Sequence, residues 1–161
     1  MRFVANGMLG KLARWLRLAG YDVIYMGRTN LPPEGQDERI LETVNEEGGV
    51  LLTADVQLHR RALRQGLRSV LIRETEVAGQ LAEISRRLGE RIEIIPEKSR
   101  CSVCNGTLTP VAKDTVEGMV PEKVLMTNDF WRCTNCGKIY WRGKHWKNIT
   151  EEVNKYNDLL K

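Results

Sequence analysis

The sequence predicts an α/β fold in which helices flank a parallel sheet, followed by a small cysteine-containing ribbon. Up to Pro96, short apolar runs alternate with helical patterns, and this order builds a parallel sheet. After Pro96, four cysteines occur in two C-x-x-C pairs and aromatic residues concentrate. A chain of 161 residues is long enough for one domain with an appendage or for two small domains.

Five short apolar runs are the expected strands, at residues 2–5, 21–25, 50–53, 69–72 and 92–95. The run VLLT at 50–53 is continuously apolar, which is typical of a strand buried on both faces. These runs predict a sheet formed by residues 1–96.

The expected helices cover about 7–19, 37–47, 56–65 and 76–88. In the first, the apolar residues recur at i, i+3, i+4 and i+7, and Gly20 follows at the usual C-terminal position. Residues 30–35 (NLPPEG) have the composition of a loop, so Asp37 is expected to begin the second helix. The end of the chain, 149–161, is expected to be helical, with Thr150 as its cap.

At 96–99 the alternation of apolar runs and helical patterns gives way to cysteine pairs and aromatic residues, and this change predicts a domain boundary. The expected units are a first domain at 1–97, a ribbon at 98–148 and a helical tail at 149–161.

The overall charge permits a polyanionic partner. The net charge is +4 and the pI is about 9.0, which is mildly basic. No apolar run is long enough to cross a membrane, and the apolar stretch at the N-terminus is too short for a signal peptide. We therefore expect a cytoplasmic protein with no membrane contact. Its oligomeric state stays open, with a homodimer as one option.

Two cysteine pairs, Cys101–Cys104 and Cys133–Cys136, predict a structural zinc site. Four thiolates in two tight turns form a closed tetrahedral site. Asn105-Gly106 and Gly137 follow the pairs and suit turns whose N–H groups point at the sulfurs. The alternative is a pair of disulfides or four unrelated thiols.

Three polar residues are expected at the carboxyl edge of the sheet, where open parallel sheets bind ligands. Asn6 follows the first strand, Asp37 begins a helix after the second, and Asp55 follows the third. Oxygen ligands of this kind suit Mg²⁺ or Mn²⁺, which can activate water for attack at phosphorus. Each of the three also occupies a position typical of a helix cap, so both interpretations stay open.

Several segments resemble one known family: VANGMLGKLARWLRLAGYDV, DERIL, GGVLLTAD with LHRRAL, SRCSVCNGTL and CTNCGKIYWRGKHW. Together they resemble the Mut-seven C-terminal RNase domain family, over nearly the whole chain to about residue 147. The resemblance implies a PIN-like nuclease fold with an appended zinc ribbon. It also implies acidic residues that bind a divalent metal for RNA cleavage.

The sequence departs from that family at two positions. The family has an aspartate where this chain has Asn6, and its T-R-D motif is Thr53-Ala54-Asp55 here. The amide at position 6 removes one negative charge from the implied metal site. The resemblance therefore implies a ribonuclease weakened at Asn6.

Basic residues form three groups that could follow an RNA backbone. They are Lys11, Arg14 and Arg17 near the N-terminus, Arg60 and Arg61 beside Asp55, and Lys138, Arg142 and Lys144 in the ribbon. In the ribbon they alternate with tryptophan and tyrosine, which stack on unpaired bases or pack a small core. The leading hypothesis is a metal-dependent ribonuclease with RNA as its partner. The alternative is a catalytically inactive RNA-binding protein.

Overall fold

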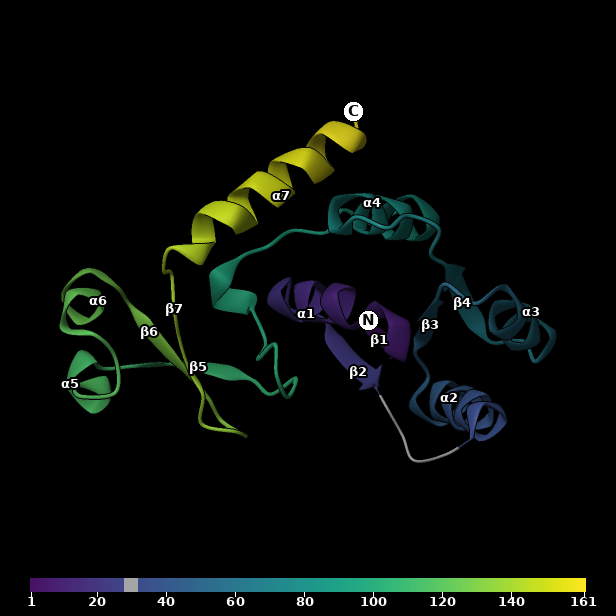
Figure 1. Cartoon of the computed structure of the whole chain (residues 1–161), viewed down its shortest axis with the longest axis horizontal. Helices are drawn as coiled ribbons and strands as arrows, with labels where there is room; N and C mark the ends of the chain where they lie inside the picture. The colour runs from purple at the N-terminus through teal and green to yellow at the C-terminus, as the bar shows by residue number, and fades with distance from the viewer. Residues whose placement is uncertain (28–31) are drawn as a thin grey trace.

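The computed structural model describes residues 1–27 and 32–161. Its first half contains a four-stranded parallel sheet in the order β2-β1-β3-β4 (Figure 1). The strands are β1 (Arg2–Asn6), β2 (Asp22–Met26), β3 (Val50–Thr53) and β4 (Arg68–Leu71). Each lies within about one residue of an expected strand, so the predicted parallel α/β architecture is confirmed.

Four helices cover the two faces of this sheet. They are α1 (Gly10–Leu18), preceded by the 3-10 turn η1 (Gly7–Leu9), then α2 (Pro33–Glu47), α3 (Val56–Arg64) and α4 (Val77–Leu88). One face packs against α1 and α4, and the other against α2 and α3. The first half of the chain thus forms three layers, helix–sheet–helix.

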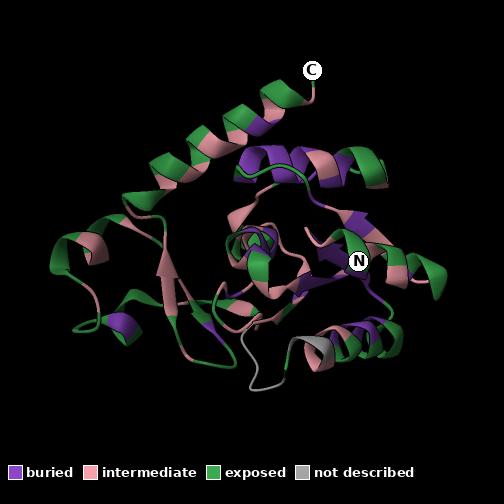
Figure 2. Ribbon diagram, turned by 45° about the vertical axis from the view of Figure 1, so that its right-hand side comes forward, coloured by how far each residue is buried: buried purple, intermediate pink, exposed green. Residues whose placement is uncertain are grey.

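Alternation along the strands divides the core between the two faces, because successive side chains of a strand point in opposite directions. Phe3 and Leu52 pack toward α1 and α4, whereas Val4 and Leu51 pack toward α2 and α3. All four are buried. The buried residues gather on the strands and on α4, whereas the last helix of the chain is mostly exposed (Figure 2).

The second half contains a three-stranded antiparallel sheet in the order β5-β6-β7. Its strands are β5 (Leu108–Val111), β6 (Phe130–Cys133) and β7 (Ile139–Trp141). Two short helices, α5 (Lys113–Val116) and α6 (Glu122–Thr127), lie in the connection between β5 and β6. This unit lies to the left in Figure 1, beside the C-terminal end of α1.

The last helix, α7 (His145–Leu159), runs from the antiparallel sheet back onto α4 (Figure 1). Its anchor is Tyr156, which is buried. The Tyr156 hydroxyl lies 2.8 Å from Ser85 Oγ and accepts a hydrogen bond from the Ile92 backbone N–H at 2.8 Å. The C-terminal segment is thus docked on the first half of the molecule.

The structure corrects the expected strand at 92–95. These residues are not in a strand; a 3-10 turn, η2 (Pro96–Lys98), follows them. The Ile92 N–H bonds to Tyr156 instead of to a neighbouring strand, so α7 takes a backbone donor that a sheet would need.

Two expected helix starts are also wrong. The second helix begins at Pro33, so Asp37 lies inside it and is not its cap; proline is favoured in the first turn. Of the expected loop at 30–35, residues 30 and 31 lie outside the described part of the chain. The terminal helix begins at His145, and Thr150 donates to the Trp146 carbonyl at 3.0 Å within it. Within residues 1–27 and 32–161, no helix is long and apolar enough to span a membrane.

Candidate functional sites

The strand order places a topological switch between β1 and β3. From β1 the chain crosses to β2 on one side, and from β3 it crosses to β4 on the other. Open α/β sheets bind ligands at the carboxyl ends of the strands that flank such a switch. Here these ends are Asn6 of β1 and Thr53 of β3.

A short hydrogen-bond chain joins the two strand ends. Asn6 Nδ2 donates to Thr53 Oγ1 at 3.0 Å, and the Asp55 backbone N–H donates to the same oxygen at 3.0 Å. Thr53 is fully buried. Its hydroxyl therefore fixes the position of Asn6 relative to Asp55, a role that the sequence patterns did not reveal.

Asp55 caps α3, as its position after β3 suggested. Its Oδ1 accepts hydrogen bonds from the backbone N–H groups of Gln57 at 2.9 Å and Leu58 at 3.2 Å. Within residues 1–27 and 32–161, Oδ2 accepts no hydrogen bond. The carboxylate can therefore cap the helix and still offer one oxygen to a cation, so capping and metal binding are compatible at this residue.

Asn6 does not act as a side-chain cap. It is the last residue of β1, and its side chain makes no hydrogen bond to the backbone of η1. The amide instead reaches across to Thr53 on the neighbouring strand.

Asp37 lies in α2, near enough to Asp55 for the charge of Asp55 to affect it. Partial burial raises its pKa, and the negative charge of Asp55 raises it further, although Arg61 opposes both effects. Repulsion between carboxylates is expected where two of them share one site. A bound cation would relieve that repulsion.

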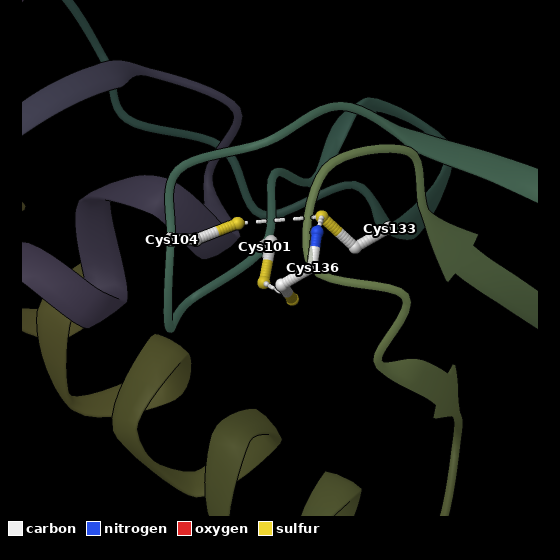
Figure 3. Close-up of side chains that lie close together, drawn as sticks. All are labelled: Cys101, Cys104, Cys133 and Cys136. Carbon is white, nitrogen blue, oxygen red and sulfur yellow. Dashed lines mark hydrogen bonds between the residues drawn. The ribbon is translucent and has the colours of Figure 1, made fainter.

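The four cysteines form a second cluster (Figure 3). All four Sγ atoms lie within 4.8 Å of one another. Two pairs are closer, Cys104–Cys133 at 3.4 Å and Cys101–Cys136 at 3.7 Å. A tetrahedron with Zn–S bonds of about 2.3 Å has sulfurs about 3.8 Å apart. The cluster thus fits structural zinc, and none of the four cysteines is in a disulfide.

The two cysteine turns have matching backbones. The Cys101 N–H donates to the Gly106 carbonyl at 2.8 Å, and the Cys133 N–H donates to the Lys138 carbonyl at 2.9 Å. In each turn the residue after the second cysteine has a left-handed backbone, with φ of 70° at Asn105 and 77° at Gly137. The two turns therefore present their sulfurs in the same way.

The surroundings of Cys101 and Cys104 favour the thiolate, the form that binds zinc, by lowering the pKa of both. At Cys136 a backbone hydrogen bond from Lys138 lowers the pKa, but burial and the other three thiols outweigh it and raise the pKa to about 11. A hydrogen bond from the Asn135 side chain is the main cause that lowers the pKa of Cys104, to about 6. The backbone N–H groups of Asn135 and Cys136 each lie 3.4 Å from Cys133 Sγ. Gly106 passes so close that a Cβ there would lie 2.6 Å from Cys133 Sγ.

The first cysteine turn is attached to the parallel sheet through Arg17. This arginine is only 7% exposed. Its guanidinium donates to the Val23 carbonyl at 2.8 and 3.1 Å, to Ser102 at 3.0 Å and to Val103 at 3.3 Å. The expected contact between Arg17 and RNA is therefore replaced by a structural role, because the cysteine turn covers this face of α1.

Asn105 makes the second link. Its Oδ1 accepts from the Val23 backbone N–H at 3.0 Å, and its Nδ2 donates to Asp22 Oδ1 at 2.7 Å. The edge strand β2 is thus bonded directly to the cysteine turn.

The other basic residues singled out in the sequence lie at the surface. Lys11 and Arg14 are exposed on α1, and Arg60 is exposed on α3. Arg61 forms an ion pair with Glu38.

In the ribbon, Lys138, Arg142 and Lys144 are exposed. Lys138 lies over the Tyr140 ring, with its Nζ 5.2 Å from the centroid. Arg142 lies at the same distance over Trp146 and also pairs with Glu97 at 3.3 Å.

Comparison with known proteins gives one match. The family described as the Mut7-C RNAse domain matches residues 1–153. The comparison with curated proteins found no match, and neither did the comparison with solved structures.

Proposed function

This chain belongs to the Mut7-C RNAse domain family, and we propose from that membership and from the carboxyl edge that it is a metal-dependent ribonuclease weakened at Asn6. The observation that carries the proposal is the hydrogen-bonded link between the ends of β1 and β3, to which the proposal adds Asp37 of α2. Asn6 and Asp55 share Thr53 as a hydrogen-bond partner, and partial burial and the negative charge of Asp55 raise the pKa of Asp37. The proposal includes a PIN-like fold for the parallel sheet.

The donor set suits a hard divalent cation. Two carboxylates and an amide offer only oxygen ligands, which Mg²⁺ and Mn²⁺ prefer. Such an ion, when bound, activates a water and stabilises charge on a phosphodiester. The residues of this chain contribute position: Thr53 holds Asn6, and the N-terminus of α3 holds the Asp55 carboxylate.

Asn6 lowers the affinity of this edge for a cation. At an effective dielectric constant of about 20, unit charges roughly 4 Å apart interact by on the order of 4 kcal/mol. Desolvation offsets much of this, but even about 1.4 kcal/mol corresponds to a tenfold change in affinity. An amide supplies a dipole in place of that full charge, so cleavage by this chain is weak.

RNA binding does not depend on that charge. Lys11, Arg14 and Arg60 lie on α1 and α3, the helices that follow β1 and β3. Lys138, Arg142 and Lys144 belong to the ribbon, which we propose binds structural zinc at its four cysteines. A cavity of about 60 Å³ lies between the ribbon, α1 and α7, and its aromatic walls suit stacking on an unpaired base.

A second candidate function is RNA binding without cleavage. Asn6 is the observation that favours it, because the amide leaves only two carboxylates at the carboxyl edge. The basic and aromatic surface of the ribbon would then carry the function.

A cleavage assay with Mn²⁺ separates the two functions. We expect single-stranded RNA to be cleaved slowly or not at all by the parent chain and at least tenfold faster by Asn6→Asp. Adding Asp55→Asn to that variant should abolish the gain. Asn45→Asp is the matched control, because Asn45 is exposed on α2 and acquires the same charge away from the edge.

Equal cleavage rates for the parent and Asn6→Asp would exclude Asn6 from the metal site. Cleavage by neither, with intact RNA binding, would favour the second function. Because asparagine before glycine deamidates readily, the parent protein is checked by mass spectrometry before each assay.

A further inference from the structure

A groove of about 510 Å³ runs along the outer side of β4, the edge strand of the parallel sheet. Its floor is β4, and its walls come from α3 on one face of the sheet and from α4 on the other. In Figure 1, β4 lies at the right-hand end of the sheet, next to α3. The groove is distinct from the cysteine cluster and from the residues at the ends of β1 and β3.

Four arginines line this groove from separate elements. Arg60 belongs to α3, Arg68 to β4, Arg87 to α4, and Arg73 follows β4. No aspartate or glutamate is among the lining residues. Four positive charges therefore surround one hollow without a carboxylate to balance them.

These guanidinium groups are also unpaired. Across residues 1–27 and 32–161, none of the four makes a side-chain hydrogen bond or ion pair, whereas Arg2 and Arg61 do pair with carboxylates. Glu83 bonds to the backbone N–H of Arg73 and not to its guanidinium. The groove thus holds charge that the described chain leaves uncompensated.

His59 lies among these charges, and its pKa responds to them. Its Nδ1 is 2.7 Å from Ser69 Oγ, and both residues line the groove. Burial lowers the pKa of His59, and Arg87, Arg60 and Arg73 lower it further. Three of the guanidiniums therefore act on one point, which supports their convergence.

Protection of an exposed strand edge is a simpler explanation for part of this arrangement. Charged residues on edge strands prevent pairing with other chains, and Arg68 alone could do so. That purpose does not require Arg60, Arg73 and Arg87, which extend from the flanking segments toward the same hollow.

We propose that the groove along β4 binds the phosphate backbone of the RNA strand as it leaves the carboxyl edge. This rests on the proposed function, which supplies RNA as the ligand. The path is continuous, because Asp55 caps α3 and the next residue, Val56, lines the groove. From there Arg60 and Arg73 lead along β4 toward Arg68.

Charge favours this occupant over a second copy of the chain. Two β4 edges placed together would bring eight unpaired guanidiniums into one interface, and like charges across an interface are costly. A polyanionic strand neutralises the same groups and releases its own counterions.

The test is the salt dependence of binding to a labelled single-stranded RNA, measured without Mg²⁺ or Mn²⁺ so that no cleavage occurs. Each lost phosphate contact on single strands lowers the slope of log K against log salt by about 0.7. We expect Arg68→Gln/Arg87→Gln to flatten the slope by about 1.4. Lys113→Gln/Lys123→Gln, which removes the same charge from exposed residues of the short helices α5 and α6, should leave it unchanged.

An unchanged slope for the arginine double variant would overturn the proposal. If that variant also loses thermal stabilisation by inorganic phosphate, the groove serves a small anion. If it instead loses binding of a polyglutamate peptide, the groove serves an acidic protein. All four side chains are exposed, and unchanged circular dichroism and melting confirm that the variants fold.

The cleavage assay reports separately on the proposed function. A flattened slope in a chain whose Asn6→Asp variant does not cleave RNA would support the groove and refute the ribonuclease. Restored cleavage with an unchanged slope would do the reverse.

Discussion

The cysteine cluster and the proposed site at the carboxyl edge both draw on side chains of types that bind metals, but they differ in completeness. At the cysteine cluster four sulfurs lie within 4.8 Å of one another, and matched backbone turns hold them. At the carboxyl edge, Thr53 links the amide of Asn6 to the backbone of Asp55, and the proposed site adds the carboxylates of Asp37 and Asp55. The first arrangement suits a permanent structural ion, whereas the second suits an ion that binds weakly and exchanges.

The two regions also differ in how their ligands are spaced along the chain. Each cysteine turn is set by a few consecutive residues, so spacing alone predicts its geometry. Asn6 and Asp55 are linked through Thr53 only because β1 and β3 are neighbours in the sheet, and the proposed site adds Asp37 from α2. The geometry of a turn built from consecutive residues can therefore be predicted from the sequence. A site built from distant residues can be predicted only when the strand order is known.

The largest expected effect is at the cysteine cluster. Dividing the roughly 10–16 kcal/mol of structural zinc binding among four ligands gives about 3 kcal/mol for each thiolate. We expect Cys104→Ser to weaken zinc binding more than a hundredfold, measured by competition with a chromophoric chelator. Val103→Ser is the control, because Val103 is in the same turn and is 60% exposed. Equal zinc affinity in Cys104→Ser and the parent would show that the cluster is not a zinc site.

The next effect is on the attachment of the cysteine turn to the sheet. Arg17→Met removes the donors to the Val23, Ser102 and Val103 carbonyls, and unsatisfied buried groups are costly. We expect the free energy of unfolding to fall by roughly 2–4 kcal/mol. Arg14→Met, on the exposed side of the same helix, should change it by less than about 0.5 kcal/mol. Similar losses in both variants would contradict the structural role of Arg17.

Arg17 also shows where sequence reasoning stops. Its spacing with Lys11 and Arg14 predicted a basic stripe, and the helix itself was predicted correctly. Whether a helix face meets solvent or another segment depends on residues 100–105, which lie far away in the sequence. The same long-range dependence explains the absent strand at 92–95, since Tyr156 of α7 takes the Ile92 N–H.

The helices and strands themselves were easier to predict from the sequence. The four strands of the parallel sheet were predicted because their apolar runs are short and bounded, and the cysteine cluster because its spacing is local. Thr53 was missed because its role depends on contact with Asn6 across the sheet.

The smallest expected effect is a loss of stability in acid where Asp22 of β2 accepts hydrogen bonds from Asn105 of the cysteine turn and from Arg2. Burial alone would raise the pKa of Asp22, but hydrogen bonds from Asn105 and Arg2 outweigh it and hold the pKa below its ordinary value. A carboxylate whose pKa is lower in the folded state than in the unfolded state stabilises the fold. This stabilisation is fully present at pH values above the unfolded pKa and is lost as the pH falls through the folded pKa. We expect the parent to lose more stability than Asp22→Asn between pH 5 and about pH 3, measured by thermal melting of both proteins in the same buffers. Parallel pH profiles would show that this carboxylate does not contribute.

The most direct test of the proposed metal site at the carboxyl edge is Mn²⁺ binding itself. Electron paramagnetic resonance counts free Mn²⁺ during titration of the zinc-loaded protein, so cleavage is not needed as a readout. We expect Asn6→Asp to bind Mn²⁺ about tenfold more tightly than the parent, and Asn45→Asp to bind like the parent. Adding Asp55→Asn to Asn6→Asp should reverse the gain. Equal Mn²⁺ affinity in the parent and Asn6→Asp would contradict the account, because position 6 would then lie outside any cation site.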